Sequence, residues 1–184
     1  MRGRLRIWIG IAAVVVACSP AAAAAGGKQT HPATFSGRCD FSGLVRFRPG
    51  LSTTPRTVAQ SVKAPGTCSG SFRDRHGFTH MLSGAHVVFS ETSSGGNVSC
   101  AFGNPTGSGS LRFHWGTLRF AFAERRAGAA VTGAATGARG GSATGYGAPS
   151  TSESPVSAVE ECGGAGIRQV RVDLHVATTP DISG

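Results

Sequence analysis

The chain is poor in acidic side chains and almost lacks lysine, and these shortages narrow the chemistry open to it. Its 184 residues include nine aspartates and glutamates against eighteen lysines and arginines, which gives a formal net charge of +9. Acid–base catalysis by two convergent carboxyl groups therefore has few candidates. A phosphate-binding P-loop is excluded because its glycine-rich candidate, residues 103–109, lacks the required lysine.

The chain also lacks an apolar run long enough to span a membrane. The run at residues 7–17 contains 11 residues, whereas a spanning helix needs about 20. It follows a segment with three arginines and precedes Pro20 and an Ala-x-Ala sequence at 23–25. This layout is typical of a bacterial export signal. We therefore expect residues 1–25 to be a signal peptide, cleavage after Ala25, and a secreted, extracellular product.

Lipidation at Cys18 is the alternative to cleavage after Ala25. The sequence VVAC at 15–18 also resembles a lipobox, the motif of bacterial lipoproteins, in which the Cys18 thiol carries a lipid. The product would then be a membrane-anchored lipoprotein, and membrane contact is expected only through the signal segment or a lipidated Cys18. We favour simple cleavage. Residues 26–36 are expected to be flexible, because Ala, Gly, Thr and Pro offer little to bury.

Cysteine is scarce, and its count is even once Cys18 is removed or lipidated. An even number in an exported chain indicates disulfides, and four cysteines allow three connectivities. Metal binding is disfavoured because no Cys-x-x-Cys pair is present, so we expect neither a metal site nor a cofactor. Successive strands bring successive cysteines together, which favours two bridges: Cys39–Cys68 and Cys100–Cys162.

No segment has a convincing helical period, and alternation of apolar and polar residues predominates. The clearest example is the run of apolar residues at every second position from Val170 to Val176. We predict an all-β domain over residues 37–184, an antiparallel sandwich or barrel of about eight to ten short strands. The low-complexity stretch 127–155 is expected to contain two weak strands, followed by a loop at 150–156.

Turn signals and aromatics complete the predicted fold. We expect a loop at residues 52–65, a hairpin turn at 93–96 and a glycine-rich hairpin at 103–109. Eight aromatic residues fall on the predicted inward faces, where they could line a ligand cavity, but core packing is the favoured interpretation. They are Phe47, Phe72, Phe89, Phe102, Phe113, Trp115, Phe120 and Phe122.

Candidates for catalysis are weak. The sequence GTCSG at 66–70 has the glycine spacing of a nucleophile elbow, but no helix pattern follows it and Cys68 is expected to be oxidised. His76 and His80 are four apart with His86 beyond them. Such a pair converges on a metal only on a helix, so we interpret these three as solvated. His114 and His175 are expected on outward strand faces.

The carboxylates show no pairing along the chain. Glu160 and Glu161 are the sole adjacent pair, and neighbours on a strand point to opposite faces. Five others could come together only through folding, and the sequence does not indicate which of them do. They are Asp40, Asp74, Glu91, Glu124 and Asp173.

Three short motifs carry a family resemblance. They are CDFSG at 39–43, VRFRPGL at 45–51 and GTCSG at 66–70. Together they resemble small secreted β-rich proteins of high-G+C Gram-positive bacteria that have no assigned activity. The resemblance implies an exported β domain with cysteine bridges, and it implies no functional residue.

These observations predict a non-enzymatic exported β domain that binds at the cell surface or in the extracellular space. Its expected partners are an anionic cell-wall polymer, a surface protein or a small apolar ligand. Nucleic acid is disfavoured because the arginines lack interleaved exposed aromatics. The alternative is a secreted hydrolase whose site is assembled from distant residues, such as His76 or His80 with Asp74 and a serine, Ser69 or Ser71.

Overall fold

The structure, a computed structural model, describes residues 31–184. The predicted signal peptide and Cys18 lie outside the described residues. Nine strands and one helix follow in order: β1 (Thr34–Leu51), β2 (Ala59–Arg73), β3 (Thr79–Ser93), β4 (Phe102–Gly103), β5 (Thr106–Phe113), β6 (Gly116–Ala127), β7 (Ala130–Gly137), β8 (Gly140–Pro149), α1 (Pro155–Gly163) and β9 (Ile167–Ser183). The predicted all-β fold is confirmed.

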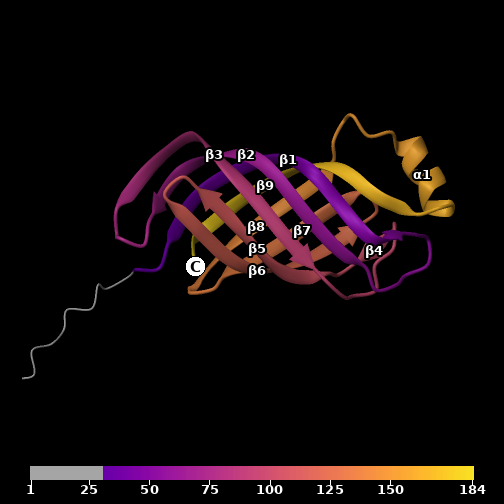
Figure 1. The fold of residues 1–184 in the computed structure, drawn as a ribbon, viewed down its shortest axis with the longest axis horizontal. Helices are drawn as coiled ribbons and strands as arrows, with labels where there is room; N and C mark the ends of the chain where they lie inside the picture. Colours follow the sequence, from indigo (N-terminus) through magenta and orange to yellow (C-terminus); the bar gives the residue numbers. More distant parts are fainter. Residues whose placement is uncertain (1–30) are drawn as a thin grey trace, which may run out of the picture.

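The strands form one antiparallel sheet that closes on itself. Its order is β4-β6-β5-β3-β2-β1-β9-β8-β7, and β6 also pairs with β7. All strands except β4 therefore belong to a continuous barrel in which sequence neighbours pair, and β1 and β9 join the two ends of the chain (Figure 1). Strands β1, β2, β3 and β9 span 15 to 18 residues, so they are longer than predicted.

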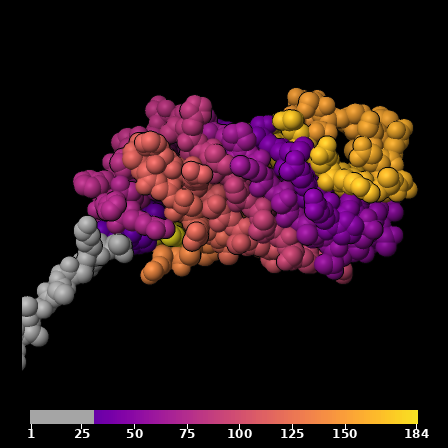
Figure 2. Space-filling model, viewed as in Figure 1, coloured from indigo at the N-terminus to yellow at the C-terminus, as the bar shows by residue number. Residues whose placement is uncertain are grey.

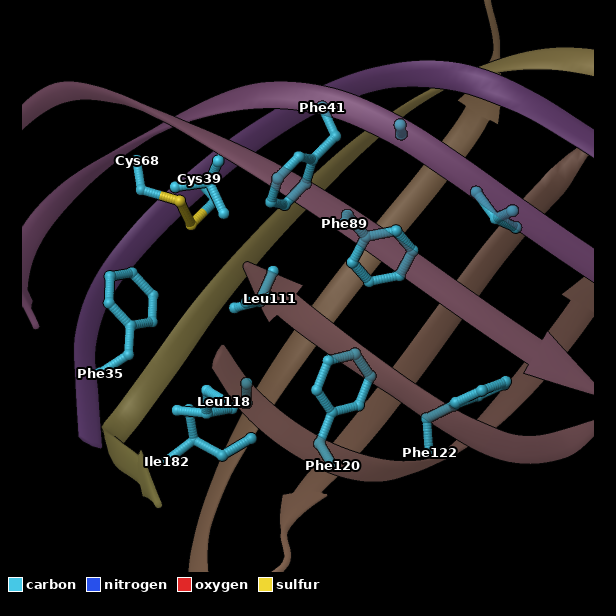
Figure 3. Close-up of a cluster of buried hydrophobic side chains, with 14 of the residues drawn as sticks. Phe35, Cys39, Phe41, Cys68, Phe89, Leu111, Leu118, Phe120, Phe122 and Ile182 are labelled. Atoms are coloured by element: carbon cyan, nitrogen blue, oxygen red, sulfur yellow. A yellow bond between two sulfur atoms is a disulfide. The ribbon is translucent and has the colours of Figure 1, made fainter. Parts of the chain in front are cut away.

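The predicted alternation puts large apolar side chains inside the barrel. Phe35 and Phe41 on β1, Phe89 on β3 and Phe120 on β6 are buried. Figure 3 shows these rings with Leu111, Leu118 and Ile182 pointing into a shared interior. The Phe41 and Phe89 ring centres are 5.3 Å apart, a separation typical of favourable aromatic contact. The core therefore joins strands from both halves of the chain.

Glycines on β5 make room for two of these rings. A Cβ atom at Gly109 would lie 2.4 Å from Phe120 Cζ, and one at Gly107 would lie 2.8 Å from Phe122 Cζ. Real Cβ atoms do not approach so closely, so both rings pack directly on the β5 backbone. Strands β3 and β6, which flank β5, can therefore bring their inward side chains together across it.

Four predicted loop, turn or flexible segments differ from the structure. Residues 59–65 belong to β2, because Gln60, Val62 and Ala64 are buried at alternate positions and pair with β3. The expected hairpins at 93–96 and 103–109 are absent from the described sheet, since β3 pairs with β5 across the long connection 94–105 and β4 pairs with β6. Strand β1 begins at Thr34, inside the segment expected to be flexible, because Phe35 is fully buried.

The two aromatics expected inside at strand ends are outside. Phe102 is 50% exposed and Trp115 is 41% exposed. Phe102 belongs to the two-residue strand β4, and Trp115 occupies the turn between β5 and β6, where the inward–outward alternation ends. The other six predicted core aromatics are buried: Phe47, Phe72, Phe89, Phe113, Phe120 and Phe122.

The sequence does not predict helix α1, since its first residues fall within the loop expected at 150–156. Ser154 is its N-cap and accepts a hydrogen bond from the Ser157 backbone N–H, and Pro155 starts the helix. Both are favoured at these positions. None of its residues is buried, and Figure 2 shows the segment projecting from one end of the molecule. Among residues 31–184, no helix is long and apolar enough to cross a membrane.

Candidate functional site

The barrel interior is only partly filled, because one side of its wall has small side chains. Strands β7 and β8 turn Gly133, Ala135, Ala143 and Gly145 inwards, opposite the large rings of β3 and β6. A cavity of about 60 Å³ lies between them, within a larger hollow of about 610 Å³ that includes space open to solvent. The low-complexity stretch thus forms the two predicted strands, and their small residues leave the cavity.

Two carboxyl groups stand at the wall of this apolar cavity. Glu91 on β3 and Glu124 on β6 both line it, and each continues the inward alternation of a phenylalanine two residues earlier, Phe89 and Phe122. Gln60 on β2 joins them, since its Nε2 donates to Glu91 Oε1 and to Glu124 Oε2, each at 3.2 Å. Folding therefore brings together two of the five scattered carboxylates.

Arg126 completes this cluster of four side chains from outside the cavity lining. Its guanidinium donates to Gln60 Oε1 at 2.9 Å and lies over the Phe47 ring, 5.2 Å from the ring centre. We refer to Gln60, Glu91, Glu124 and Arg126 as the Glu91 cluster. Arg126 Nε and the nearby Ser93 Oγ are buried without a hydrogen-bond partner among the described residues, so hydrogen-bonding capacity at this cluster remains unused.

Burial changes the protonation of the Glu91 cluster. Loss of solvent, followed by the negative charge of Glu124 and a hydrogen bond with it, raises the pKa of Glu91 to about 9. Glu91 is therefore mainly protonated at neutral pH. Burial also lowers the pKa of Arg126, while the charges of Glu124 and Glu91 act in the opposite direction. Arginine nonetheless stays charged in proteins, so with Glu124 ionised the cluster is close to neutral overall.

Of the side chains predicted for a hydrolase site, only those of His80 and Asp74 are joined by a hydrogen bond within the described residues. His80 Nε2 lies 3.0 Å from Asp74 Oδ2, and the His80 ring stacks on Trp115 at 4.3 Å. The interpretation of His80 as merely solvated is thus wrong. Within residues 31–184 no hydrogen bond links His80 to Ser69 or Ser71, and Ser69 Oγ instead accepts from the Gly84 backbone N–H. Neither of these two serines therefore completes the pair as a nucleophile.

Asp74 has a structural role in the turn between β2 and β3. Its Oδ1 accepts hydrogen bonds from the backbone N–H groups of His76 and Phe78, at 2.9 and 3.0 Å. The hydrogen bond with His80, helped by those from the two backbone groups, lowers the pKa of Asp74 against the opposing effect of burial. The His76 and His86 residues are exposed, as predicted. The Asp74–His80 pair therefore stabilises a turn.

A second polar group lies on the outside of the barrel. Asp40, His175 and Tyr146 are direct neighbours across β1, β9 and β8. His175 Nδ1 and Asp40 Oδ1 lie within hydrogen-bond distance, 2.5 Å apart, and the Tyr146 ring stacks on His175. Both side chains are substantially exposed, and exposed pairs contribute little to stability. His175 thus points outwards, as predicted, and has a partner that the sequence did not indicate.

The cysteines form the two predicted bridges, Cys39–Cys68 and Cys100–Cys162. Cys39 and Cys68 lie directly opposite each other on β1 and β2. Because Cys68 is oxidised within a strand, the nucleophile-elbow interpretation is ruled out, in agreement with the expectation. No group of three His, Cys, Asp or Glu side chains suited to a metal occurs among the residues that the structure describes.

Sequence alternation contained the signal for the Glu91 cluster. Glu91 and Glu124 occupy inward positions directly after phenylalanines in the alternation, and Ser93 and Arg126 follow at the next inward positions. An acidic residue at such a position indicates a buried charge or a site. Which strands face each other could not be read from either run alone. Comparisons with protein-family models, with curated proteins and with solved structures find no significant match for this chain.

Proposed function

We propose that this chain is a non-enzymatic binding protein that takes a small, mainly apolar molecule into its barrel. The observation that carries the proposal is a cavity bounded by Phe89, Phe120 and Phe122 on one side and by the glycines and alanines of β7 and β8 on the other. Ligand sites of this kind have apolar walls with a few polar groups that fix orientation. Glu91 and Glu124 supply those polar groups.

Two features of the chain support a role outside the cytoplasm. The two disulfides are typical of proteins in an oxidising compartment, and the arrangement of residues 1–25 is that of an export signal. We propose secretion, with lipid anchoring at Cys18 as the alternative. Binding to a cell-wall polymer or a surface protein remains a weaker proposal, since the pocket in the interior favours a small ligand.

A hydrolase is less well supported by the same geometry. Catalysis by two carboxyl groups requires both to face a scissile bond together with a water molecule. Glu91 and Glu124 instead share one amide nitrogen of Gln60, so both carboxyl groups are held by the same side chain. The alternative predicted from Asp74 and His80 lacks its nucleophile.

Titration with n-butanol, followed by ¹H–¹⁵N NMR, tests the binding proposal. We expect saturable shifts of the amides of Ala135, Ala143 and Val176, which line the cavity. Ala135→Val should weaken binding about tenfold, because its added methyl groups occupy the space. Ala121→Val, on the exposed face of β6, is the matched control and should bind as the wild type does. Shifts that do not saturate, or equal affinities of both variants, would refute the proposal.

A further inference from the structure

The charged chemistry of the cavity is concentrated at one place, where it presents acidic side chains. Glu91 and Glu124 are the only ionisable residues among those that line it within the described chain. Arg126 stands behind them, bonded to Gln60 and stacked over Phe47. A ligand entering from the cavity therefore meets carboxyl oxygens before it meets a cation. Such a surface favours a ligand end that donates hydrogen bonds.

Gln60 fixes the two carboxyl groups and engages one oxygen of each. Its single side-chain nitrogen is shared between Glu91 Oε1 and Glu124 Oε2, and its oxygen is taken by Arg126. Both of its N–H groups and its oxygen are thereby engaged. Glu91 Oε2 and Glu124 Oε1 take no part in these bonds. Glu91 and Glu124 are also hydrogen-bonded to each other, so a ligand donor that enters the site would replace that contact with bonds to one carboxyl oxygen from each side chain.

We propose that the cavity binds a small primary amine, with its ammonium group held by Glu91 and Glu124 and its apolar part against the phenylalanines of β3 and β6. This inference rests on the proposed function and names the ligand class for the same site. An ammonium carries three donors and a positive charge, which matches two acceptors of opposite charge. A carboxylate ligand would instead face Glu124 with a like charge.

Binding should release a proton. The groups facing Glu91 are Glu124 and Arg126 on β6 and Gln60 on β2, while β5 contributes only Gly107 and Gly109 to this side. In the free protein Glu91 holds a proton that keeps the cluster near neutrality. When an alkylammonium enters, the Glu91 O–H bond breaks, the proton leaves to solvent, and the carboxylate so formed pairs with the ammonium. Charge inside the barrel is thereby conserved.

The test uses n-butylamine, n-butanol and butyrate, which share a chain of similar length and differ in the polar end. We expect butylamine to bind the wild type at least tenfold more tightly than butanol at pH 7.5, and butyrate to bind most weakly. Calorimetry in two buffers of different ionisation enthalpy should show close to one proton released with butylamine and none with butanol. A smaller preference for butylamine, or no proton release, overturns the inference.

Variants separate this inference from the proposal beneath it. Glu124→Gln should reduce butylamine affinity at least tenfold and butanol affinity much less, because butanol carries no charge, and Glu91→Gln should abolish the released proton. Glu160→Gln, on exposed α1, is the control and should behave as the wild type does. If butanol binds but butylamine is not preferred, the amine inference is wrong and the binding function stands. If none of the three binds, both are wrong.

Discussion

Single residues decide the electrostatics of this barrel, and Glu91 is the most informative of them. It is 6% exposed, and Phe89 and Ser93 flank it on the inward face of β3. An isolated carboxylate there would be strongly destabilising, and two features avoid that state. Glu91 retains its proton. In addition, Gln60 donates a hydrogen bond to Glu91, and Arg126, which is bonded to Gln60, brings a positive charge close to the carboxyl groups. The stability of the fold therefore depends on pH through Glu91.

We predict that Glu91→Gln flattens the dependence of stability on pH. The pKa of Glu91 rises from 4.5 to about 9 on folding, so between these pH values the folded state binds more protons than the unfolded state. The free energy of unfolding therefore falls as pH rises through this window, with a slope of up to about 1.4 kcal/mol per pH unit. Glutamine resembles the protonated carboxyl and cannot ionise, so it removes this slope.

Urea denaturation at intervals from pH 5 to pH 9 measures the effect. Wild type and Glu91→Gln should agree most closely near pH 5 and diverge as pH rises, with the variant more stable. The control Glu160→Gln, at an exposed position on α1, should follow the wild type throughout. Parallel curves for Glu91→Gln and the wild type would show that Glu91 does not carry a raised pKa.

At the scale of strands and helices, the two disulfides stabilise different parts of the molecule. Cys39–Cys68 joins residues already opposite each other on β1 and β2, and both are 1% exposed. Cys100–Cys162 instead links the connection between β3 and β5 to the end of α1. That helix is nine residues long and buries none of them, and a helix of this length is marginal without other support. Its order therefore depends on the bridge.

We predict that removing each bridge has a distinct effect on hydrogen exchange. Cys100→Ala with Cys162→Ala should deprive residues 155–163 of protection while the barrel strands keep theirs. Cys39→Ala with Cys68→Ala should lower the stability of the whole barrel by about 2–4 kcal/mol, because that bridge lies in the core. Mass-spectrometric hydrogen exchange on both double variants tests this. Retained protection of α1 without its bridge would contradict the assignment.

The strands and the helix also show which parts of the fold the alternation of apolar and polar residues predicts. It located the inward faces of β1, β3, β6 and β9, because a closed sheet with an apolar interior demands a period of two. It missed the start of β2 at Ala59, since proline, threonine and serine nearby are turn signals that the pairing with β3 overrides. It missed α1 because a short exposed helix has no buried face to impose a period. Ser154 and Pro155 were its only signals.

Contacts between side chains on different strands could not be predicted from the sequence, and the reason is different. Alternation says that Glu91 and Glu124 point inwards, but their meeting depends on β5 presenting glycines at positions 107 and 109 between β3 and β6. The contact of His80 with Trp115 likewise depends on two turns lying at the same end. Such contacts are set by the register of several strands together, and no segment contains this information alone.

At the scale of the whole molecule, large side chains fill one part of the barrel interior more completely than the other. Phenylalanines fill the half made by β1, β3, β5 and β6, while β7 and β8 contribute glycine and alanine. A uniformly packed core would be more stable, since unfilled space forfeits contacts that the lining atoms would otherwise make. Proteins commonly give up stability where function needs it. The unfilled half is thus what a binding function requires of this fold.

This imbalance predicts that filling the cavity stabilises the protein while it weakens binding. Cavities destabilise by about 24 cal/mol per Å³, so a volume of 60 Å³ corresponds to about 1.4 kcal/mol. Ala135→Val fills part of it, and valine also suits a strand, so we expect a gain of up to about 1 kcal/mol, or roughly 2–4 °C in Tm. Ala121→Val on the outer face of β6 controls for strand propensity alone. A lower Tm for Ala135→Val than for this control would mean that the β7–β8 side has no space to fill, and the binding function would lose its site.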